Sequence, residues 1–157
     1  MQIQETILVI FVFIIMLLIG LIMFYRANVE SIKNEEFKDR LIKFYDMTSY
    51  FPNLPEVKCS SLSQESECID VLKVLALANS NVEKDFIADN ITVFVIYPEA
   101  VNKECSRASL SDCNTFKLHA NKPKNIKSVY RTSTLVSLYY PEEEKHKVGR
   151  LVLEMYT

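Results

Sequence analysis

The hydrophobic pattern of the chain changes from continuous to periodic near residue 26. From Ile7 to Tyr25 every residue is apolar, and a helix of that length, at about 1.5 Å per residue, covers roughly 28 Å, enough to cross a bilayer. After Arg26, apolar residues recur at helical spacing among charged ones. Because no proline occurs before Pro52, we expect one helix from about residue 2 to about residue 48. Its first half is apolar on every side, and the apolar stripe of its second half should pack on the domain that follows.

A second helical pattern begins in a serine-rich stretch. Apolar residues at helical spacing line one face of a helix expected over roughly 66–79, namely Ile69, Leu72, Leu75 and Ala76. Ser63 or Ser66 is the expected N-cap, because a serine hydroxyl can accept a hydrogen bond from the first free backbone amides of a helix. This is the one short helix expected after the N-terminal helix.

Three segments have the alternation and the β-branched or aromatic content that are typical of strands. Residues 91–98 read ITVFVIYP, and residues 128–140 and 148–157 lie on either side of a charged turn at 141–147. The last two segments are expected to pair as an antiparallel β-hairpin. The polar stretch 99–124 is expected to be mostly loop.

Together these elements predict an α+β fold, in which a long N-terminal hydrophobic α-helix is followed by a small, mainly antiparallel β head with one short helix. The expected domains are the N-terminal helix, residues 1–50, and the head, residues 51–157. Within the helix, 1–25 is the apolar segment for assembly or membrane insertion, and 26–50 is an amphipathic stalk. A head of about a hundred residues is large enough to have its own core.

The four cysteines form two close pairs, Cys59 with Cys68 and Cys105 with Cys113, and each pair encloses a polar, serine-rich interval. Four cysteines allow three disulfide connectivities, and proximity in the sequence favours two local loops. Zinc binding is an alternative, although zinc sites usually use closer pairs, and free thiols are another. Disulfides imply an oxidising compartment outside the cytoplasm.

The sequence contains no motif that indicates an enzyme, a cofactor or a metal site. His119 and His146 lie in polar segments without partner clusters, and no phosphate-binding, dinucleotide-binding, zinc-protease or nucleophile-elbow motif occurs. The net charge is −2, with 18 basic and 20 acidic residues interleaved, a balance that does not indicate a nucleic-acid surface. Asn90 begins an N-glycosylation sequon, Asn-Ile-Thr, and is a candidate acceptor.

Glu5 is the one charged residue ahead of the apolar segment. A charge at the edge of an apolar helix is costly unless it is paired, and the amino-terminal amine, from the same chain or from a neighbour in a helix bundle, can pair with it. Such a pair would also fix the axial register of the bundled helices. The alternative is an interfacial carboxylate among lipid headgroups.

All 18 basic residues follow the apolar segment. The positive-inside rule would therefore place the head in the cytoplasm, whereas disulfides would place it outside. The conflict disappears if a basic leader preceded residue 1 and has been removed. We therefore expect the numbering to begin near a processed terminus; the alternative is that Met1 is the initiator.

In its N-terminal part the chain resembles the type IV pilin superfamily, and archaeal pilins more than bacterial ones. The resemblance covers about the first 45 residues and rests on Glu5 at the fifth position, the apolar helix and the continuous stalk, with Met1 in place of the phenylalanine of bacterial pilins. It implies that a prepilin peptidase removes a leader and that the chain resides temporarily in the cytoplasmic membrane. It also implies polymerisation into an extracellular filament on the cell surface, with Glu5 neutralising the amine of an adjacent subunit.

The expected function is a structural subunit of a type IV pilus-like filament for adhesion or motility. Its partners would be other copies of itself, the membrane before assembly, the prepilin peptidase and the assembly machinery. The alternatives are a single-pass membrane-anchored extracellular binding or sensor domain, and a minor pilin of a secretion or uptake machine. No nucleic-acid partner, cofactor, metal or catalytic residue is expected. The residues expected to carry assembly are Met1, Glu5, Ile7, Phe11, Leu18, Gly20 and Phe24.

Overall fold

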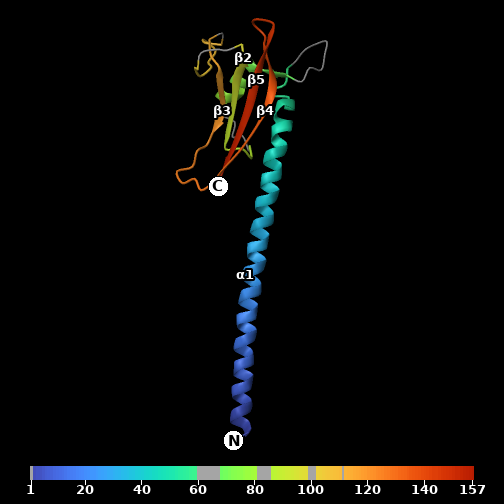
Figure 1. Ribbon diagram of the computed structural model, residues 1–157, viewed down its shortest axis with the longest axis vertical. Helices are drawn as coiled ribbons and strands as arrows, with labels where there is room; N and C mark the ends of the chain where they lie inside the picture. The colour runs from blue at the N-terminus through green and yellow to red at the C-terminus, as the bar shows by residue number, and fades with distance from the viewer. Residues whose placement is uncertain (1, 60–67, 81–85, 99–101, 111) are drawn as a thin grey trace. The chain divides into compact units, whose positions relative to one another are not determined.

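The fold is α+β (Figure 1). The computed structural model describes residues 2–59, 68–80, 86–98, 102–110 and 112–157, with the backbone alone for residues 2–6. In chain order the elements are α1 (Gln2–Tyr50), the 3₁₀ helix η1 (Phe51–Asn53), β1 (Cys68–Asp70), α2 (Val71–Asn79), β2 (Asn90–Tyr97), β3 (Thr115–Ala120), β4 (Val129–Tyr140) and β5 (Lys145–Tyr156). The chain divides into two compact units, Met1–Leu41 and Ile42–Thr157, and the second unit contains the expected head together with the last turns of α1.

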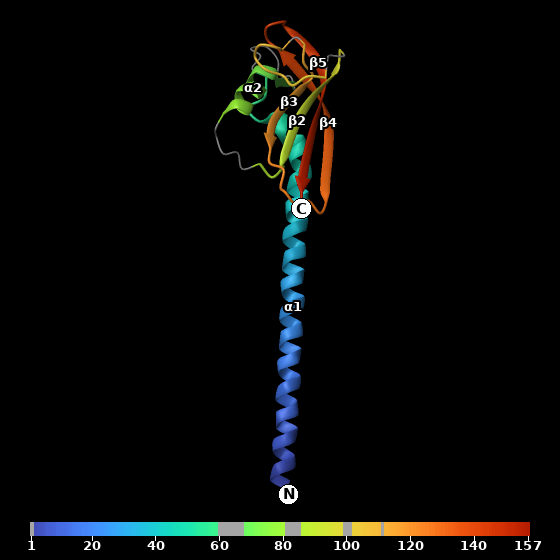
Figure 2. The ribbon, with the colours of Figure 1, turned by 90° about the vertical axis from the view of Figure 1, so that its left-hand side faces the viewer.

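Helix α1 is continuous from Gln2 to Tyr50 (Figures 1 and 2), which confirms the long helix predicted from the sequence. No proline interrupts it, and Gly20 is its only glycine, at a cost of about 1 kcal/mol relative to alanine. In the first unit, residues 7–28 are all exposed. This stretch therefore depends on its own backbone hydrogen bonds and on whatever apolar surroundings its side chains find.

The last turns of α1 are part of the core of the second unit. Phe44 is fully buried, Met47 is 8% exposed, and the Thr48 hydroxyl donates a hydrogen bond to Thr132 Oγ1 on β4 at 3.3 Å. Pro52 lies in η1, directly after the helix, and Phe51 beside it is fully buried. The predicted packing of the amphipathic half on the head is thus confirmed for these last turns.

Among the described residues, five strands form one mixed sheet in the order β1-β4-β5-β2-β3. Strands β4 and β5 form an antiparallel hairpin whose register runs from Val129 opposite Tyr156 to Tyr140 opposite Lys145. Strand β2 is antiparallel to both β5 and β3, and the short β1 is parallel to β4. The predicted fold class, with a mainly antiparallel head, is confirmed.

One face of this sheet carries the core. Leu151, Leu153 and Met155 alternate along β5 and are fully buried, beside Ile91 and Val93 of β2. Helix α2 packs against β1, β3 and β4, and the end of α1 contacts β4 through Thr48; both helices are seen beside the strands in Figure 2. The residues on the opposite face of the sheet are more exposed.

The hairpin and the strand before it are close to the sequence prediction, but the turn is shorter. The charged turn expected at 141–147 is limited to Pro141–Glu144, because Lys145 already pairs with Tyr140. Strand β2 begins at Asn90, one residue before the predicted segment 91–98.

Of the predictions for the rest of the head, one is incomplete and one is wrong. The described part of the stretch 99–124 is mostly loop, as predicted, but it also contains the strand β3, which was not expected and whose Phe116 and Leu118 are buried in the core. The second helix begins at Val71 rather than near residue 66, and its N-cap is Asp70, whose Oδ1 accepts hydrogen bonds from the amides of Leu72 and Lys73. Ser63 and Ser66, the predicted N-caps, lie outside the described residues.

Gly149 is required where β5 crosses the core. A Cβ on this residue would lie 2.5 Å from Leu138 Cδ1, 2.8 Å from Leu138 Cγ and 3.0 Å from the Phe94 carbonyl oxygen. The carbonyl belongs to the neighbouring strand and cannot move without disturbing the β2–β5 pairing. Only glycine therefore fits between these strands without displacement.

We expect Gly149→Ala to lower the free energy of unfolding of the second unit by about 1–3 kcal/mol, because the methyl group overpacks this site. The measurement is thermal unfolding of the full chain in detergent, followed by the circular dichroism of the sheet. Gly20→Ala is the matched control, since nothing lies within 4 Å of the position of its Cβ. Equal unfolding temperatures for Gly149→Ala and the unmodified chain would contradict the close packing.

Candidate assembly interface

Among the described residues, the apolar segment of α1, residues 7–25, is the largest exposed apolar surface. Its large side chains are between 40% exposed, at Ile15, and 71% exposed, at Met16. Among the described residues, one helix is long and apolar enough to cross a membrane by length and composition, with a mean hydropathy of 3.5 in its most apolar window. None of that window is buried, so the segment needs an apolar partner that the isolated chain does not supply.

The residues predicted to carry assembly lie on two opposite faces of this segment. At 100° per residue, Ile7, Phe11 and Leu18 fall on one face, whereas Gly20 and Phe24 fall on the other. Their exposed fractions are 62% for Ile7, 63% for Phe11, 54% for Leu18 and 67% for Phe24. A helix with exposed apolar side chains on two opposite faces cannot bury them all by packing against one neighbouring helix.

Gly20 forms the floor of a shallow notch on its face of the helix. Nothing lies within 4 Å of the position that its Cβ would take. The missing side chain leaves a depression that a large side chain of another helix can enter, as small residues allow in membrane helix pairs. The residues that line the notch are Phe13, Met16, Leu17, Gly20, Leu21 and Phe24.

The two remaining assembly residues are at the start of the chain. Glu5 lies in the first turns of α1, where a carboxylate interacts favourably with the helix dipole, but its side chain is outside the described residues. Met1 is also outside them. The pairing role predicted for Glu5 therefore rests on the sequence alone.

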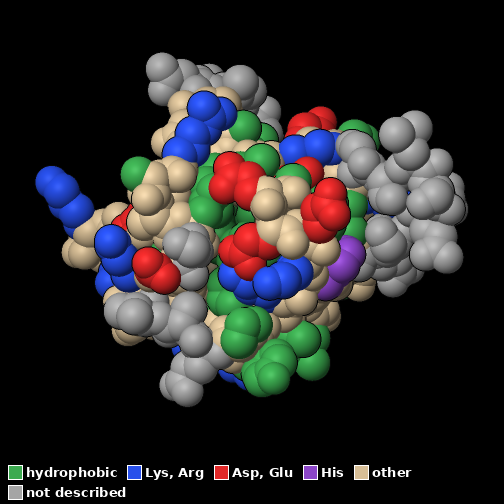
Figure 3. Space-filling view, turned by 90° about the horizontal axis from the view of Figure 1, so that it is seen from above, with side chains coloured by type: hydrophobic (Ala, Val, Ile, Leu, Met, Phe, Trp, Pro, Cys, Tyr) green, Lys and Arg blue, Asp and Glu red, His purple; other side chains and the backbone are tan. Residues whose placement is uncertain are grey.

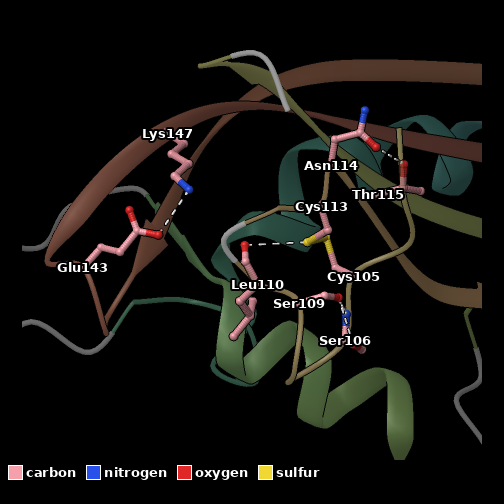
Figure 4. Close-up of a disulfide and its surroundings, with 9 residues drawn as sticks. All are labelled: Cys105, Ser106, Ser109, Leu110, Cys113, Asn114, Thr115, Glu143 and Lys147. Atoms are coloured by element: carbon pink, nitrogen blue, oxygen red, sulfur yellow. Dashed lines mark hydrogen bonds and ion pairs between the residues drawn. A yellow bond between two sulfur atoms is a disulfide. The ribbon is translucent and has the colours of Figure 1, made fainter. Parts of the chain in front are cut away.

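The cysteine pairs are disulfides, as predicted. Cys59 is bonded to Cys68, with a Cα–Cα distance of 5.5 Å, and Cys105 to Cys113, with 5.1 Å. No cysteine is free, so the zinc and free-thiol alternatives are wrong. The second disulfide closes the loop before β3 (Figure 4), and the Cys105 amide anchors this loop by donating a hydrogen bond to the Thr115 carbonyl at 2.7 Å.

Glu154 is the centre of a hydrogen-bond network at one end of the sheet. It is 8% exposed and accepts hydrogen bonds from Asn90 Nδ2 at 2.9 Å, from Arg131 Nε at 2.7 Å and from the Tyr156 hydroxyl at 2.7 Å. Burial alone would raise the pKa of this carboxyl group, but the three hydrogen bonds and the charge of Arg131 outweigh it and hold the pKa below its usual value. Glu154 is therefore ionised in the folded head at neutral pH.

This network involves the candidate glycosylation site. The Nδ2 atom of Asn90, to which a glycan would be attached, donates to Glu154, and Thr92, the third residue of the sequon, is 6% exposed. A glycan would take the place of one of the two hydrogens of Nδ2, so a modified Asn90 would have one N–H left to donate to Glu154. Glycosylation of Asn90 stays a prediction.

Tyr140 is a buried polar residue that the sequence does not single out. It is 3% exposed, and its hydroxyl group has no hydrogen-bond partner among the described residues. Burial, and secondarily the Glu143 carboxylate, raise the pKa of Tyr140 to about 12. Lys147 Nζ lies 3.8 Å from the centre of its ring and 3.4 Å from Glu143 Oε1 (Figure 4). An unpaired buried hydroxyl is a cost to folding rather than a contribution.

The described residues do not bring together a catalytic or metal-binding constellation. No group of three His, Cys, Asp or Glu side chains among them could hold a metal ion. His119 is half-buried with its ring 6.2 Å from that of Phe86, and His146 is exposed, with Nδ1 3.1 Å from the Ser137 hydroxyl. The two histidines are in separate surroundings, so the apolar segment remains the strongest candidate site.

Comparison of the chain with protein-family models, with curated proteins and with solved structures finds no match in any of the three.

We expect the head to lose stability in acid through Glu154. Because folding lowers the pKa of this carboxyl group, its contribution is complete above the unfolded value of about 4.3 and is lost as the pH falls through the folded value. Glu154→Gln should lower the free energy of unfolding at pH 7 by about 1–3 kcal/mol and flatten its dependence on pH below 5. Denaturant unfolding from pH 7 to pH 3 measures both effects. The control, Glu104→Gln, removes an exposed ion pair with Lys117 and should change the free energy of unfolding little. If the free energy of unfolding of Glu154→Gln depends on pH as that of the unmodified chain does, the network is contradicted.

Tyr140→Phe should raise the free energy of unfolding, by about 1 kcal/mol, because it removes a buried hydroxyl group that has no hydrogen-bond partner in the described part of the chain. Tyr139→Phe, at the neighbouring half-buried position, is the matched control and should be neutral. Thermal unfolding of both variants at pH 7 provides the comparison. A loss of stability in Tyr140→Phe would show that the hydroxyl group has a partner in solution.

Proposed function

We propose that this chain is a structural subunit of an extracellular, type IV pilus-like filament that polymerises through the apolar segment of α1. The observation that carries the proposal is the exposure of residues 7–25 on every side of the helix. Such a surface is stable only in lipid or among other apolar helices. A filament whose axis is a bundle of these helices would bury this apolar surface outside the membrane.

The two faces of the segment favour many neighbours over one. A helix that only dimerises needs one apolar stripe. Here the face of Ile7, Phe11 and Leu18 and the opposite face around Gly20 are both apolar and exposed. A copy of this helix can therefore pack against neighbours on each side, which is the requirement for an extended bundle.

Glu5 supports a bundle over lipid alone. Residues 1–25 contain this carboxylate and no lysine or arginine. A charge next to hydrocarbon is costly without a counter-ion, and the resemblance to pilins supplies one, the amino-terminal amine of an adjacent subunit. In the proposed filament this ion pair fixes which axial offset between subunits is stable.

The two disulfides support a position of the head outside the cytoplasm, where oxidised cysteines persist. In the proposed function, the chain is first inserted in the cytoplasmic membrane and is then assembled into a filament on the cell surface. Its partners are the membrane, a prepilin peptidase, the assembly machinery and other copies of itself, and the outcome is adhesion or motility.

Moving the segment from lipid to a helix bundle exchanges one apolar environment for another. Hydrophobic burial therefore contributes little to the direction of assembly. The close packing that the Gly20 notch allows and the pairing of Glu5 would stabilise the filament, and the machinery would supply the work of extraction.

A single-pass membrane anchor is the second candidate function, because the apolar segment matches the thickness of a bilayer. In that case the head would be a surface binding or sensor domain, and the chain would never polymerise. A minor pilin of a secretion or uptake machine is intermediate between the two, since it would polymerise only with other subunits. Electron microscopy of material sheared from the cell surface separates the candidates.

We expect Glu5→Gln to abolish the filaments or reduce them severely while the head stays folded, because the substitution removes the charge but keeps the shape of the side chain. The measurement is the amount of this chain in sheared, sedimentable fibres, with thermal unfolding of the head as the check on folding. Glu30→Gln is the matched control, an exposed acidic residue of α1 outside the apolar segment. Intact fibres of the Glu5→Gln variant would rule out the pairing role of Glu5. If cells that produce the unsubstituted chain hold it only in their membranes and form no fibres, the filament itself is ruled out.

A further inference from the structure

The face of the sheet opposite the core carries a mixed apolar and basic surface. Arg150 of β5 stands in register between Phe94 of β2 and Leu135 of β4, and Leu135 is 67% exposed. Ile96 and Val148 add two further exposed apolar side chains, 40% and 45% exposed. Exposed apolar residues around an arginine are typical of protein interfaces rather than of bare surface.

This face is hollowed between the three strands. A cavity of about 530 Å³ opens on it, with Arg131 and Arg150 among its lining residues. Arg131 is held by Glu154, whereas Arg150 has no counter-ion among the described residues. The hollow therefore offers one guanidinium group, framed by apolar side chains, to an incoming acid. Its lining residues are Asn90, Thr92, Phe94, Ile96, Arg131, Ser133, Arg150, Val152 and Glu154.

The same chain carries a complementary acidic projection. The β4–β5 turn, residues 141–144, contains three consecutive glutamates, all of them exposed. Glu143 pairs with Lys147, whereas Glu142 and Glu144 have no ion pair within the described part of the chain. Acidic side chains gather near the centre of the view in Figure 3, at the end of the head where this turn lies in Figure 1.

The hollow and the turn cannot meet within one molecule. Arg150 and Glu144 are six residues apart on the same hairpin, so about 20 Å of extended strand separates them. A contact between them must therefore join two copies. Because the two surfaces are different, the contact is heterologous and repeats from copy to copy instead of closing a symmetric dimer.

We propose that the hollow on the exposed sheet face receives the acidic β4–β5 turn of a second copy of this chain, with Arg150 paired to Glu142 or Glu144 of the neighbour. This inference rests on the proposed filament function and adds the contact that joins successive heads. Charge complementarity selects the partner: within the described residues, the hollow presents a cation without a counter-ion, and the turn presents two acids without one. The apolar rim then excludes water from the ion pair, which strengthens it.

A charge exchange tests the proposal in cells that produce the full chain. Arg150→Glu alone, and Glu142→Arg with Glu144→Arg, should each reduce the sedimentable filament about tenfold or more, because each change places like charges against each other. All three substitutions together should restore it. Lys124→Glu, in the exposed loop before β4, is the control for the change in net charge, and thermal unfolding of each variant checks the fold of the head.

A covalent trap tests the geometry directly. Ser133, on the lining of the hollow, and Glu142 are separated by more than about 20 Å of strand within one chain, beyond the reach of a disulfide. A chain with both Ser133→Cys and Glu142→Cys should therefore give a ladder of cross-linked multimers on a non-reducing gel. A mixture of the two single variants should stop at dimers.

The outcomes distinguish this contact from the filament itself. Unchanged filaments in the charge-reversal variants, or reduced filaments that the combined exchange does not restore, would overturn the contact and leave the filament proposal intact. A double cysteine variant that forms filaments without a ladder would do the same. If the unmodified chain forms no filament, the proposed function fails, and this inference fails with it.

Discussion

The apolar surface of residues 7–25 has to be hidden from water, and the organisation of the chain depends on this constraint. An isolated copy leaves the side chains of the segment exposed, and helix α1 continues through it without a break. In water, this exposed apolar surface would carry a large free-energy cost. Lipid and a bundle of identical helices are the two environments that remove the exposure, and in the proposed function the chain occupies them one after the other.

The head has its own stability, which is independent of that constraint. Its central element is the β4–β5 hairpin, in which the side chain of Leu138 and the Phe94 carbonyl of the neighbouring strand β2 leave room for glycine alone at position 149. Burial of alternate residues on one face leaves the other face free to carry Arg150 and its apolar neighbours. The strand register thus assigns one face to folding and leaves the other available for the proposed contact with a second copy.

Sequence patterns are enough for the features that depend on neighbouring residues, namely the long helix, the hairpin and the two local disulfides. They fail where distant contacts decide. Residues 68–70 form a strand because they pair with β4, 69 positions away in the chain at Ile69 and Leu138. The one local signal for the later start of the helix is Asp70, a residue type that is favoured at N-caps. The apolar residues of the candidate interface can be chosen from the sequence alone. The buried hydroxyl group of Tyr140 and the hollow around Arg150 depend on strand register, which composition does not encode.

Both disulfides bridge short intervals, with sequence separations of 9 and 8 residues, and neither links the head to α1 or leaves a free thiol for another copy. In the proposed function, oxidative folding of the head could therefore be completed while the helix is still in the membrane. In a fibre built from such subunits, no covalent bond would join one subunit to the next. It could be dismantled and its subunits returned to the lipid pool for reuse, with no reductant required.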